Sequence, residues 1–337
     1  MRIWNKVSIL FLLLAAAYLP AAAQTTRRTT AARPIPSLAA SLPASETVAL
    51  VKVRRLLDEA LPALLANNPA KLAEVNARIE NFKTRTGIDP RAFDELALGL
   101  GYEYLPSGAM KVTTVGLAHG TFNSTSLVAA GRAAAAGKYR EEKYQGKTVH
   151  VFALDEQLRV FGVLDLRIRE LAVAPLSANT LAIGDVQRVR GAIDVSKGNR
   201  RANAELISLA SQNASAIVGF GGNVSPALLA HLRIGNDAVA KDLASVRQIY
   251  GFVGMTERDV EVLAAARTAD PSSARSLGTT VEGLTAFAGL FANRLPAARA
   301  ALAKSALGNL KVTVQGNDLQ LRTAVAQAEV GPVIRGL

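Results

Sequence analysis

Cysteine is absent from this 337-residue chain, and its absence excludes several kinds of chemistry at once. Without a thiol there is no disulfide, no thiolate nucleophile, no covalently attached haem and no cysteine-type zinc site. Aromatic residues are also scarce, at 5%, although half of all residues are hydrophobic. Much of the apolar fraction is alanine, so we expect a core that packs closely but gains less burial energy per residue than a leucine-rich one.

Histidine is nearly as rare, and the motifs of common active sites are missing. The three histidines, His119, His150 and His231, show no helical ligand spacing and no H-E-x-x-H motif. His119 and His150 each lie in a predicted strand, which favours partly buried histidines over metal ligands. No G-x-S-x-G motif of a nucleophilic serine occurs. We therefore expect no catalytic residue, no metal and no cofactor.

One glycine-rich segment fits two interpretations, an anion-binding loop and a tight turn. Gly219-x-Gly221-Gly222 follows a predicted strand and precedes a predicted helix, as an anion-binding loop would. The third glycine of a dinucleotide motif would fall at position 224, which is Val224. We therefore expect a tight turn here rather than a nucleotide site.

The first 23 residues predict a secretory signal peptide. Arg2 and Lys6 precede the apolar run 7–19, and Ala21-Ala22-Ala23 provides a small-residue cleavage site. A membrane anchor is the alternative, but the apolar run of about 13 residues is shorter than the ~20 that a spanning helix needs. We expect cleavage after Ala23, export to the periplasm or medium of a bacterium, and no transmembrane helix afterwards.

Positive charge dominates the chain, with 39 Lys and Arg against 27 Asp and Glu. Residues 24–45 carry Arg27, Arg28 and Arg33 without an acid and are rich in Thr, Ala, Ser and Pro, which predicts a flexible basic tether. A solvated spacer is the favoured interpretation, and contact with an anionic lipid or polymer is the alternative. The densest basic patch, 188–201, lacks interleaved aromatic residues, so we expect no nucleic-acid partner.

Strand-like and helical patterns alternate from residue 46 onward, which predicts an α+β fold. The first unit, 46–200, has predicted strands at 47–53, 93–104 and 112–122, then an extra hairpin, a second hairpin and a helix. The second unit, 201–337, has predicted strands at 216–220, 248–255 and 260–268 and a closing hairpin. Between the strand at 260–268 and the closing hairpin, a long helix is predicted from Ser272 past Pro296 to Ala303.

The long helix carries a continuous apolar seam that needs a partner. Its apolar positions alternate steps of four and three, namely Leu277, Val281, Leu284, Ala288, Phe291 and Leu295. Such spacing fits either a coiled coil or packing on a sheet. Because Gly278, Gly283 and Gly289 weaken an isolated coil, we expect the helix to lie on a sheet.

The two units share an order of elements, which predicts an internal repeat. Residues 44–50 align with 214–220 at an offset of 170, and Gln145-Gly146 aligns with Gln315-Gly316. We predict two tandem β-α-β-β-α-β (ferredoxin-like) units with antiparallel sheets, the second a diverged repeat of the first. Chance similarity among alanine-rich helices is the alternative. A ligand cleft would then lie between the units, with Arg200 and Arg201 as a tentative binding surface.

Three short motifs resemble those of a group of exported bacterial α/β proteins that has no assigned activity. They are Leu42-Pro43-Ala44-Ser45 before the first strand, Thr86-Gly87-Ile88-Asp89 after a helix, and Leu181-Ala182-Ile183-Gly184-Asp185 leading into residues 189–194. The resemblance covers most of the chain after the tether. It implies location and fold and transfers no catalytic residue.

These patterns together predict an exported, non-enzymatic protein that binds another component of the cell envelope, whether protein or ligand. Two alternatives remain open, a carrier of an apolar or amphipathic ligand and an exported hydrolase whose site assembles from distant residues. A deep apolar cavity would favour the carrier. A cleft joining His119 or His150 to a carboxylate and a hydroxyl would favour the hydrolase.

Overall fold

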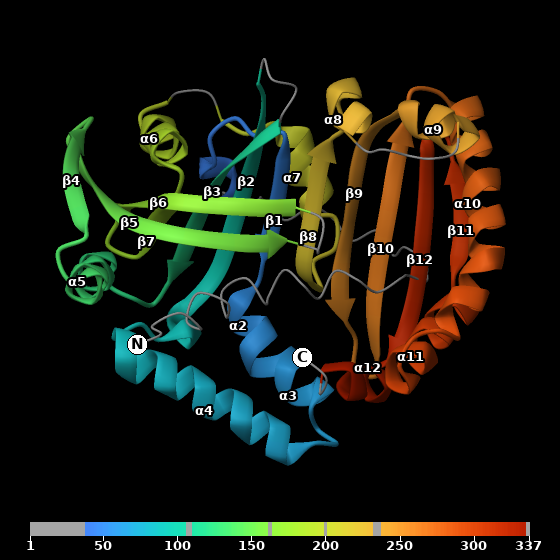
Figure 1. Cartoon of the computed structure of the whole chain (residues 1–337), viewed down its shortest axis with the longest axis horizontal. Helices are drawn as coiled ribbons and strands as arrows, with labels where there is room; N and C mark the ends of the chain where they lie inside the picture. Colours follow the sequence, from blue (N-terminus) through green and yellow to red (C-terminus); the bar gives the residue numbers. More distant parts are fainter. Residues whose placement is uncertain (1–37, 106–109, 161–163, 199–200, 232–236, 335–337) are drawn as a thin grey trace.

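The computed structural model describes residues 38–105, 110–160, 164–198, 201–231 and 237–334. The predicted signal peptide and the tether up to residue 37 lie outside the described residues. Within the described part, twelve strands form one antiparallel sheet in the order β11-β12-β10-β9-β8-β1-β2-β3-β7-β6-β5-β4 (Figure 1). The strands are β1 (Thr47–Val51), β2 (Phe93–Tyr104), β3 (Met110–Gly120), β4 (Tyr139–Tyr144), β5 (Lys147–Val160), β6 (Leu164–Ser177), β7 (Thr180–Gly184), β8 (Ala216–Asn223), β9 (Val246–Met255), β10 (Asp259–Thr268), β11 (Lys311–Gln315) and β12 (Asp318–Ala326). An α+β fold with a large antiparallel sheet is thus confirmed.

Helices cover both faces of the sheet. The largest core cluster lies on the face covered by η2 (Leu38–Ser41), α6 (Val186–Val195) and α7 (Ala204–Ala210). The opposite face packs against α5 (Ser124–Ala135), α10 (Pro271–Ala292), α11 (Ala297–Gly308) and α12 (Gln327–Ile334). The remaining helices are α2 (Val53–Arg55), η3 (Leu56–Ala60), α3 (Leu61–Leu64), α4 (Pro69–Thr86), η4 (Pro90–Ala92), α8 (Pro226–His231) and α9 (Asp237–Ala244).

Local sequence signals set the ends of several helices. Asn68 begins α4 by accepting a hydrogen bond from the Lys71 amide at 3.2 Å, and Gly87 ends it with a left-handed φ of 70°. Asn123 begins α5 by accepting from the Ser126 amide at 2.9 Å. Caps of this kind involve neighbouring residues only, which explains why the sequence alone predicts them.

The glycines at positions 219–222 lie inside strand β8, so the predicted tight turn is wrong. A Cβ atom on Gly219 would lie 2.0 Å from the carbonyl oxygen of Ala210, and one on Gly221 would lie 2.7 Å from that of Leu206. Both carbonyls belong to α7. The glycines therefore allow α7 to pack directly on the backbone of β8, the close approach that a side chain would prevent.

The sheet does not match the two ferredoxin-like units that the sequence led us to expect. Strands β1 and β2 are antiparallel neighbours, so the long helical excursion between them returns to the adjacent position and makes no parallel crossover. Strand β1 also pairs with β8, Ala49 opposite Phe220, and so joins the halves into one sheet. Strands β1 and β2 are neighbours, as in a hairpin, although a long helical segment connects them. The length of a connection alone does not determine strand order.

Strand order is nevertheless shared by the two halves. From the central β1–β8 pair outward, the first half runs β1-β2-β3-β7-β6 and the second runs β8-β9-β10-β12-β11. The β4–β5 hairpin is extra to the first half. By this order the β11–β12 hairpin corresponds to β6–β7, so the predicted equivalence of the Gln145-Gly146 and Gln315-Gly316 turns is wrong.

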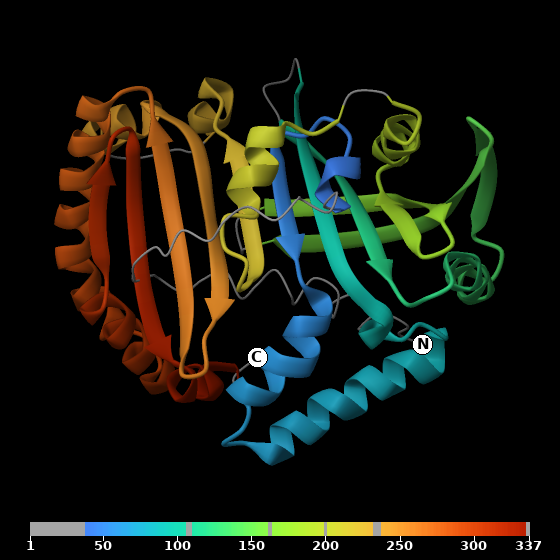
Figure 2. The same ribbon diagram turned by 180° about the vertical axis from the view of Figure 1, so that it is seen from behind.

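The predicted long helix is two helices. Helix α10 ends at Ala292, and Pro296 stands at the N-terminal boundary of α11, where its φ is −53°. Proline has no amide hydrogen to continue α10 and fits the start of a new helix. The chain therefore changes direction between the two helices, and both lie along the outer edge of the sheet beside β11 (Figures 1 and 2).

Candidate functional site

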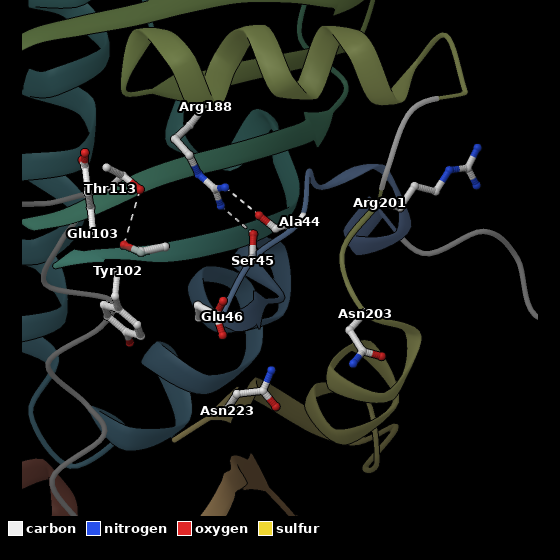
Figure 3. A pocket seen from close by; sticks show the side chains of 11 residues that line it. Ala44, Ser45, Glu46, Tyr102, Glu103, Thr113, Arg188, Arg201, Asn203 and Asn223 are labelled. Carbon is white, nitrogen blue, oxygen red and sulfur yellow. Dashed lines mark hydrogen bonds between the residues drawn. The ribbon is translucent and has the colours of Figure 1, made fainter. Parts of the chain in front are cut away.

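A polar pocket lies where the two halves meet (Figure 3). Its volume is about 560 Å³, within the usual range of ligand pockets. The lining from the first half comes from the start of β1, from β2, from β3 and from α6. The second half contributes Arg201, Asn203 and Asn223. The structure therefore provides a hollow between the halves, in the region where the sequence predicts one.

Arg188, from α6, occupies one wall of this pocket as a structural clamp. Its guanidinium donates to the Ala44 carbonyl and to the Ser45 hydroxyl oxygen, at 2.6 Å in each case. Gly99 and Gly101 make room for it on β2, because a Cβ atom on Gly99 would lie 3.4 Å from Nη2 and 2.5 Å from Ser45 Oγ. Burial lowers the pKa of Arg188. These contacts tie α6 to the entry of β1.

Arg201 lines the pocket, but its side chain is exposed and points away from Ser45 and Glu46 (Figure 3). Its backbone forms an isolated antiparallel bridge with Pro43, which places it at the junction. Arg200, the other residue of the tentative binding surface, lies outside the described residues. A binding role for this pair stays a prediction.

The pocket lining offers no obvious reaction. Glu103 is paired with Lys111 at 3.0 Å, and the hydroxyl of Ser45 donates to the Pro43 carbonyl at 2.8 Å. Positively and negatively charged side chains line the pocket, and they do not converge on one point. The arrangement suits the joining of structural elements more than the activation of a nucleophile.

A row of polar side chains crosses three strands of the first half and tests the hydrolase alternative. His119 Nδ1 lies 3.2 Å from Thr180 Oγ1, and Glu95 is in register opposite His119. Burial raises the pKa of Glu95, which works against the ionised carboxylate that orients the histidine in a hydroxyl–histidine–acid site. These residues line neither the pocket between the two halves, called the junction pocket from here on, nor the apolar groove of α10 and α11. The geometry gives little support to a hydrolase.

His150 is a buried histidine on β5, as the sequence led us to expect of a strand histidine. Its Nδ1 lies 3.5 Å from a carboxylate oxygen of Glu141 on β4 and has no hydrogen-bond partner. Burial lowers its pKa. In the part of the chain that the structure describes, no group of three or more His, Cys, Asp or Glu side chains could hold a metal ion.

The most unusual surface lies on α10 and α11. A groove of about 410 Å³ runs between these helices and is lined by apolar side chains alone: Leu284, Phe287, Ala288, Phe291, Ala292, Leu295, Ala303 and Leu307. Leu284, Phe287 and Phe291 are 52%, 62% and 63% exposed, and neighbouring Leu290 is 65% exposed. Below, this set of residues is called the α10–α11 groove, with Leu290 at its rim.

The groove exists because the sheet supports only the first part of α10. There Leu277 and Gly278 are buried, and a Cβ atom on Gly278 would lie 2.9 Å from Val314 Cγ2 of β11. Helix α11 turns Leu302 and Ala306 toward the sheet. In the last turns of α10, an added Cβ atom on Gly283 or Gly289 would have nothing within 4 Å, and the large apolar side chains are exposed. The predicted packing of the whole seam on a sheet is therefore wrong for its C-terminal half.

Part of this surface was predictable from the sequence. Leu284, Ala288, Phe291 and Leu295 were in the predicted seam, whereas Phe287 and Leu290 were not. The missed signal is their spacing from Leu284, since 284, 287 and 291 lie on one helical face and 290 lies beside it. Together these positions form an apolar face that is broader than the seam of a two-helix contact.

Comparisons with known proteins give no family. No protein-family model and no curated protein matches the chain. Among solved structures, TP0453 in crystal form I is 8% identical, with a TM-score of 0.43, and the match covers 90% of this chain and 98% of that one. Crystal form III gives 9% identity, a TM-score of 0.44 and coverages of 90% and 99%. These values are too low to carry a conclusion about fold or function.

Proposed function

We propose that this protein is an exported, non-enzymatic binding protein that attaches to another component of the cell envelope through the α10–α11 groove. One observation carries the proposal: four large apolar side chains on neighbouring turns of one helix are more than half exposed. Contiguous apolar surface is costly in water, and where it occurs it commonly marks a site of interaction.

The lining of the groove supports binding over catalysis. Its eight residues are leucine, phenylalanine and alanine, and none carries an ionisable or nucleophilic group. A reaction would need such a group in reach of the substrate. Burial of apolar area needs only shape and contact.

The shape of the groove supports docking over carriage. A carrier encloses most of the surface of its ligand, whereas Phe287 and Phe291 project into solvent. No deep apolar cavity of the kind that the carrier alternative requires is lined by these residues. An extended partner surface would cover them better than a single small molecule.

Export and the internal repeat belong to the same proposal. The predicted signal peptide and the resemblance to exported bacterial proteins support export. The shared strand order of the two halves supports a diverged repeat. The junction pocket is proposed as a second, weaker candidate surface because both halves contribute to it. Arg201 is part of its lining, and Arg200 precedes Arg201 in the sequence.

Site-directed photo-crosslinking in intact cells tests the proposal. A photoreactive phenylalanine at Leu290 should form adducts with an envelope component, and Phe287→Ser in the same chain should reduce them. The matched control places the probe at Thr279, an exposed residue on the supported part of the same helix. Equal labelling from both positions, or none from Leu290, would overturn the proposal.

A further inference from the structure

The α10–α11 groove lies in a stretch of chain with charge of one sign only. From Gly283 to Asn317 the sequence contains Arg294, Arg299, Lys304 and Lys311 and no aspartate or glutamate. The whole chain, in contrast, has 27 acids for 39 bases. An apolar surface is thus accompanied by cations without the acids that would neutralise them.

These cations stand at the border of the groove. The guanidinium of Arg294 lies 5.6 Å from the ring centroid of Phe291. Arg299 precedes Ala303 and Leu307 by one and two helical turns, so all three share a face of α11. Arg294, Arg299 and Lys304 are exposed, and the ion pairs found among the described residues do not include them. Their charge is therefore available to a partner.

Charge argues against a second copy of this chain as the partner. A symmetric dimer through the groove would set each patch against itself and bring Arg294 and Arg299 close to the same residues of the other copy. Like charges facing each other across an interface oppose association. The partner should instead carry negative charge around an apolar interior.

We infer that the α10–α11 groove docks on the surface of an anionic lipid bilayer. Leu284, Phe287, Leu290 and Phe291 would enter the boundary between headgroups and acyl chains, as the apolar face of an interfacial helix does. Arg294, Arg299 and Lys304 would meet the lipid phosphates, with their aliphatic stems along the apolar face. The inference rests on the proposed function and specifies its partner.

Peripheral attachment is consistent with the helices of this protein. Among the described residues, no helix combines the length and apolar character needed to cross a membrane. A bilayer surface also needs no matching set of hydrogen-bonding groups, and the groove presents none.

Vesicle flotation with the purified exported protein tests the inference. We expect binding to vesicles of phosphatidylcholine with about 30 mol% phosphatidylglycerol, and much weaker binding to phosphatidylcholine alone, because each cation near an anionic surface strengthens binding about fivefold. Raising salt from about 0.05 M to about 0.5 M should weaken it. Equal binding to both vesicles, or to neither, would overturn the inference.

Two sets of variants separate the contributions of charge and apolar contact. Arg294→Gln/Arg299→Gln/Lys304→Gln should weaken binding to the anionic vesicles by about a hundredfold. The control Lys138→Gln/Lys197→Gln/Lys241→Gln removes as many charges elsewhere and should have little effect. Phe287→Ser/Leu290→Ser should also reduce binding about a hundredfold, against little change for Ile249→Ser, an exposed apolar residue of β9. Equal losses in a control and its test variant would overturn the inference.

The result distinguishes failure of the inference from failure of the proposed function. If Leu290 crosslinks to an envelope protein while the vesicles are not bound, the proposed function stands and the bilayer is the wrong partner. If the protein forms dimers that Phe287→Ser disrupts, a second copy covers the groove and the bilayer inference is wrong. If neither crosslinks nor vesicle binding occur, both are wrong.

Discussion

Helix α7 and the C-terminal half of α10 both carry apolar residues, but those of α7 are buried and those of α10 are exposed. Helix α7 buries Leu206, Leu209 and Ala210, whereas α10 leaves Phe287 and Leu290 exposed. The difference lies in what is beneath each helix. Glycines of β8 let α7 approach the sheet backbone, whereas an added Cβ atom on Gly283 or Gly289 of α10 would have nothing within 4 Å. An apolar helix face shows only that some surface must cover it. The position of the sheet decides whether that surface belongs to the same fold.

Charge reinforces the contrast. Glu205 of α7 accepts from Arg267 at 2.9 Å, Arg267 also donates to Asp318 at 2.8 Å, and Tyr250 donates to Asp318 at 3.0 Å. This network links α7 to β9, β10 and β12. The ion pairs of the described residues do not include the cations near the α10–α11 groove, and we propose an external partner for them.

The largest expected effect comes from closing the approach of α7 to β8. Gly219→Val places a side chain where the Ala210 carbonyl now lies, so we expect the free energy of unfolding to fall by about 3 kcal/mol or more. Urea denaturation of the purified protein measures the change. A fall of less than about 1 kcal/mol would mean that α7 is not closely packed in solution.

Leucine truncations at the two ends of α10 compare its supported and unsupported parts. Leu277→Ala should cost about 3 kcal/mol, because it leaves a cavity in the core. Leu290→Ala should change stability by less than about 0.5 kcal/mol, as is usual for surface positions. Paired urea titrations give both values. Similar losses for the two variants would show that Leu290 is buried within the protein itself.

The network around α7 should make stability depend on alkaline pH. Burial and the neighbouring Asp318 raise the pKa of Tyr250 to about 12, against 10.0 for an ordinary tyrosine. The folded protein keeps the phenol proton that the unfolded chain loses, so this stability is present below pH 10 and is lost as pH rises toward about 12. Water and salt screen the network, so we expect a loss of about 1 kcal/mol.

Tyr250→Phe is the control for that pH dependence. It has no phenol to ionise and should lack this part of the decline, while lysines elsewhere affect both proteins equally. Urea denaturation at several pH values between 9 and 12 makes the comparison. Parallel curves for the two proteins would show that Tyr250 is not held protonated by the fold.

The smallest effects should come from two glycines of α10. Gly289 has nothing within 4 Å of an added Cβ, so Gly289→Ala should raise the free energy of unfolding by about 0.5–1 kcal/mol through helix propensity. Gly278→Ala would bring its Cβ to 2.9 Å from Val314, which should cancel or reverse that gain. Thermal unfolding measured side by side checks the order. An equal gain at both positions would contradict the close packing of α10 on β11.

Much of the secondary structure was predictable because its signals are local. The cap at Asn68, the left-handed Gly87 and the alternation in β2 depend on residues a few positions apart. Helix α7 was missed, since it has only seven residues and its one clear signal is the cap at Asn203, which accepts from the Glu205 amide at 2.9 Å. The break at Pro296 was not predicted, because the regular spacing of apolar residues favoured one continuous helix despite the proline.

The candidate site was predictable only in part, for a different reason. The seam through Leu284 and Phe291 was visible as a face that needs a partner, and the cations after it can be read from the sequence. Which part of the seam the fold leaves uncovered depends on how α10 packs against β11 and α11, which are distant or separate elements of the chain. No periodicity along the helix carries that information.

The sequence by itself determined the mixed strand and helix content, the helix caps, the excess of positive charge and the absence of cysteine. Only the tertiary structure decided that β1 pairs with β8, that glycines in a strand admit α7, and that the apolar side chains at the end of α10 are exposed. Local signals arise from backbone conformation and neighbouring side chains. Strand order and the cover of a helix arise from contacts between residues far apart in the chain, whose free energies are set by the whole arrangement.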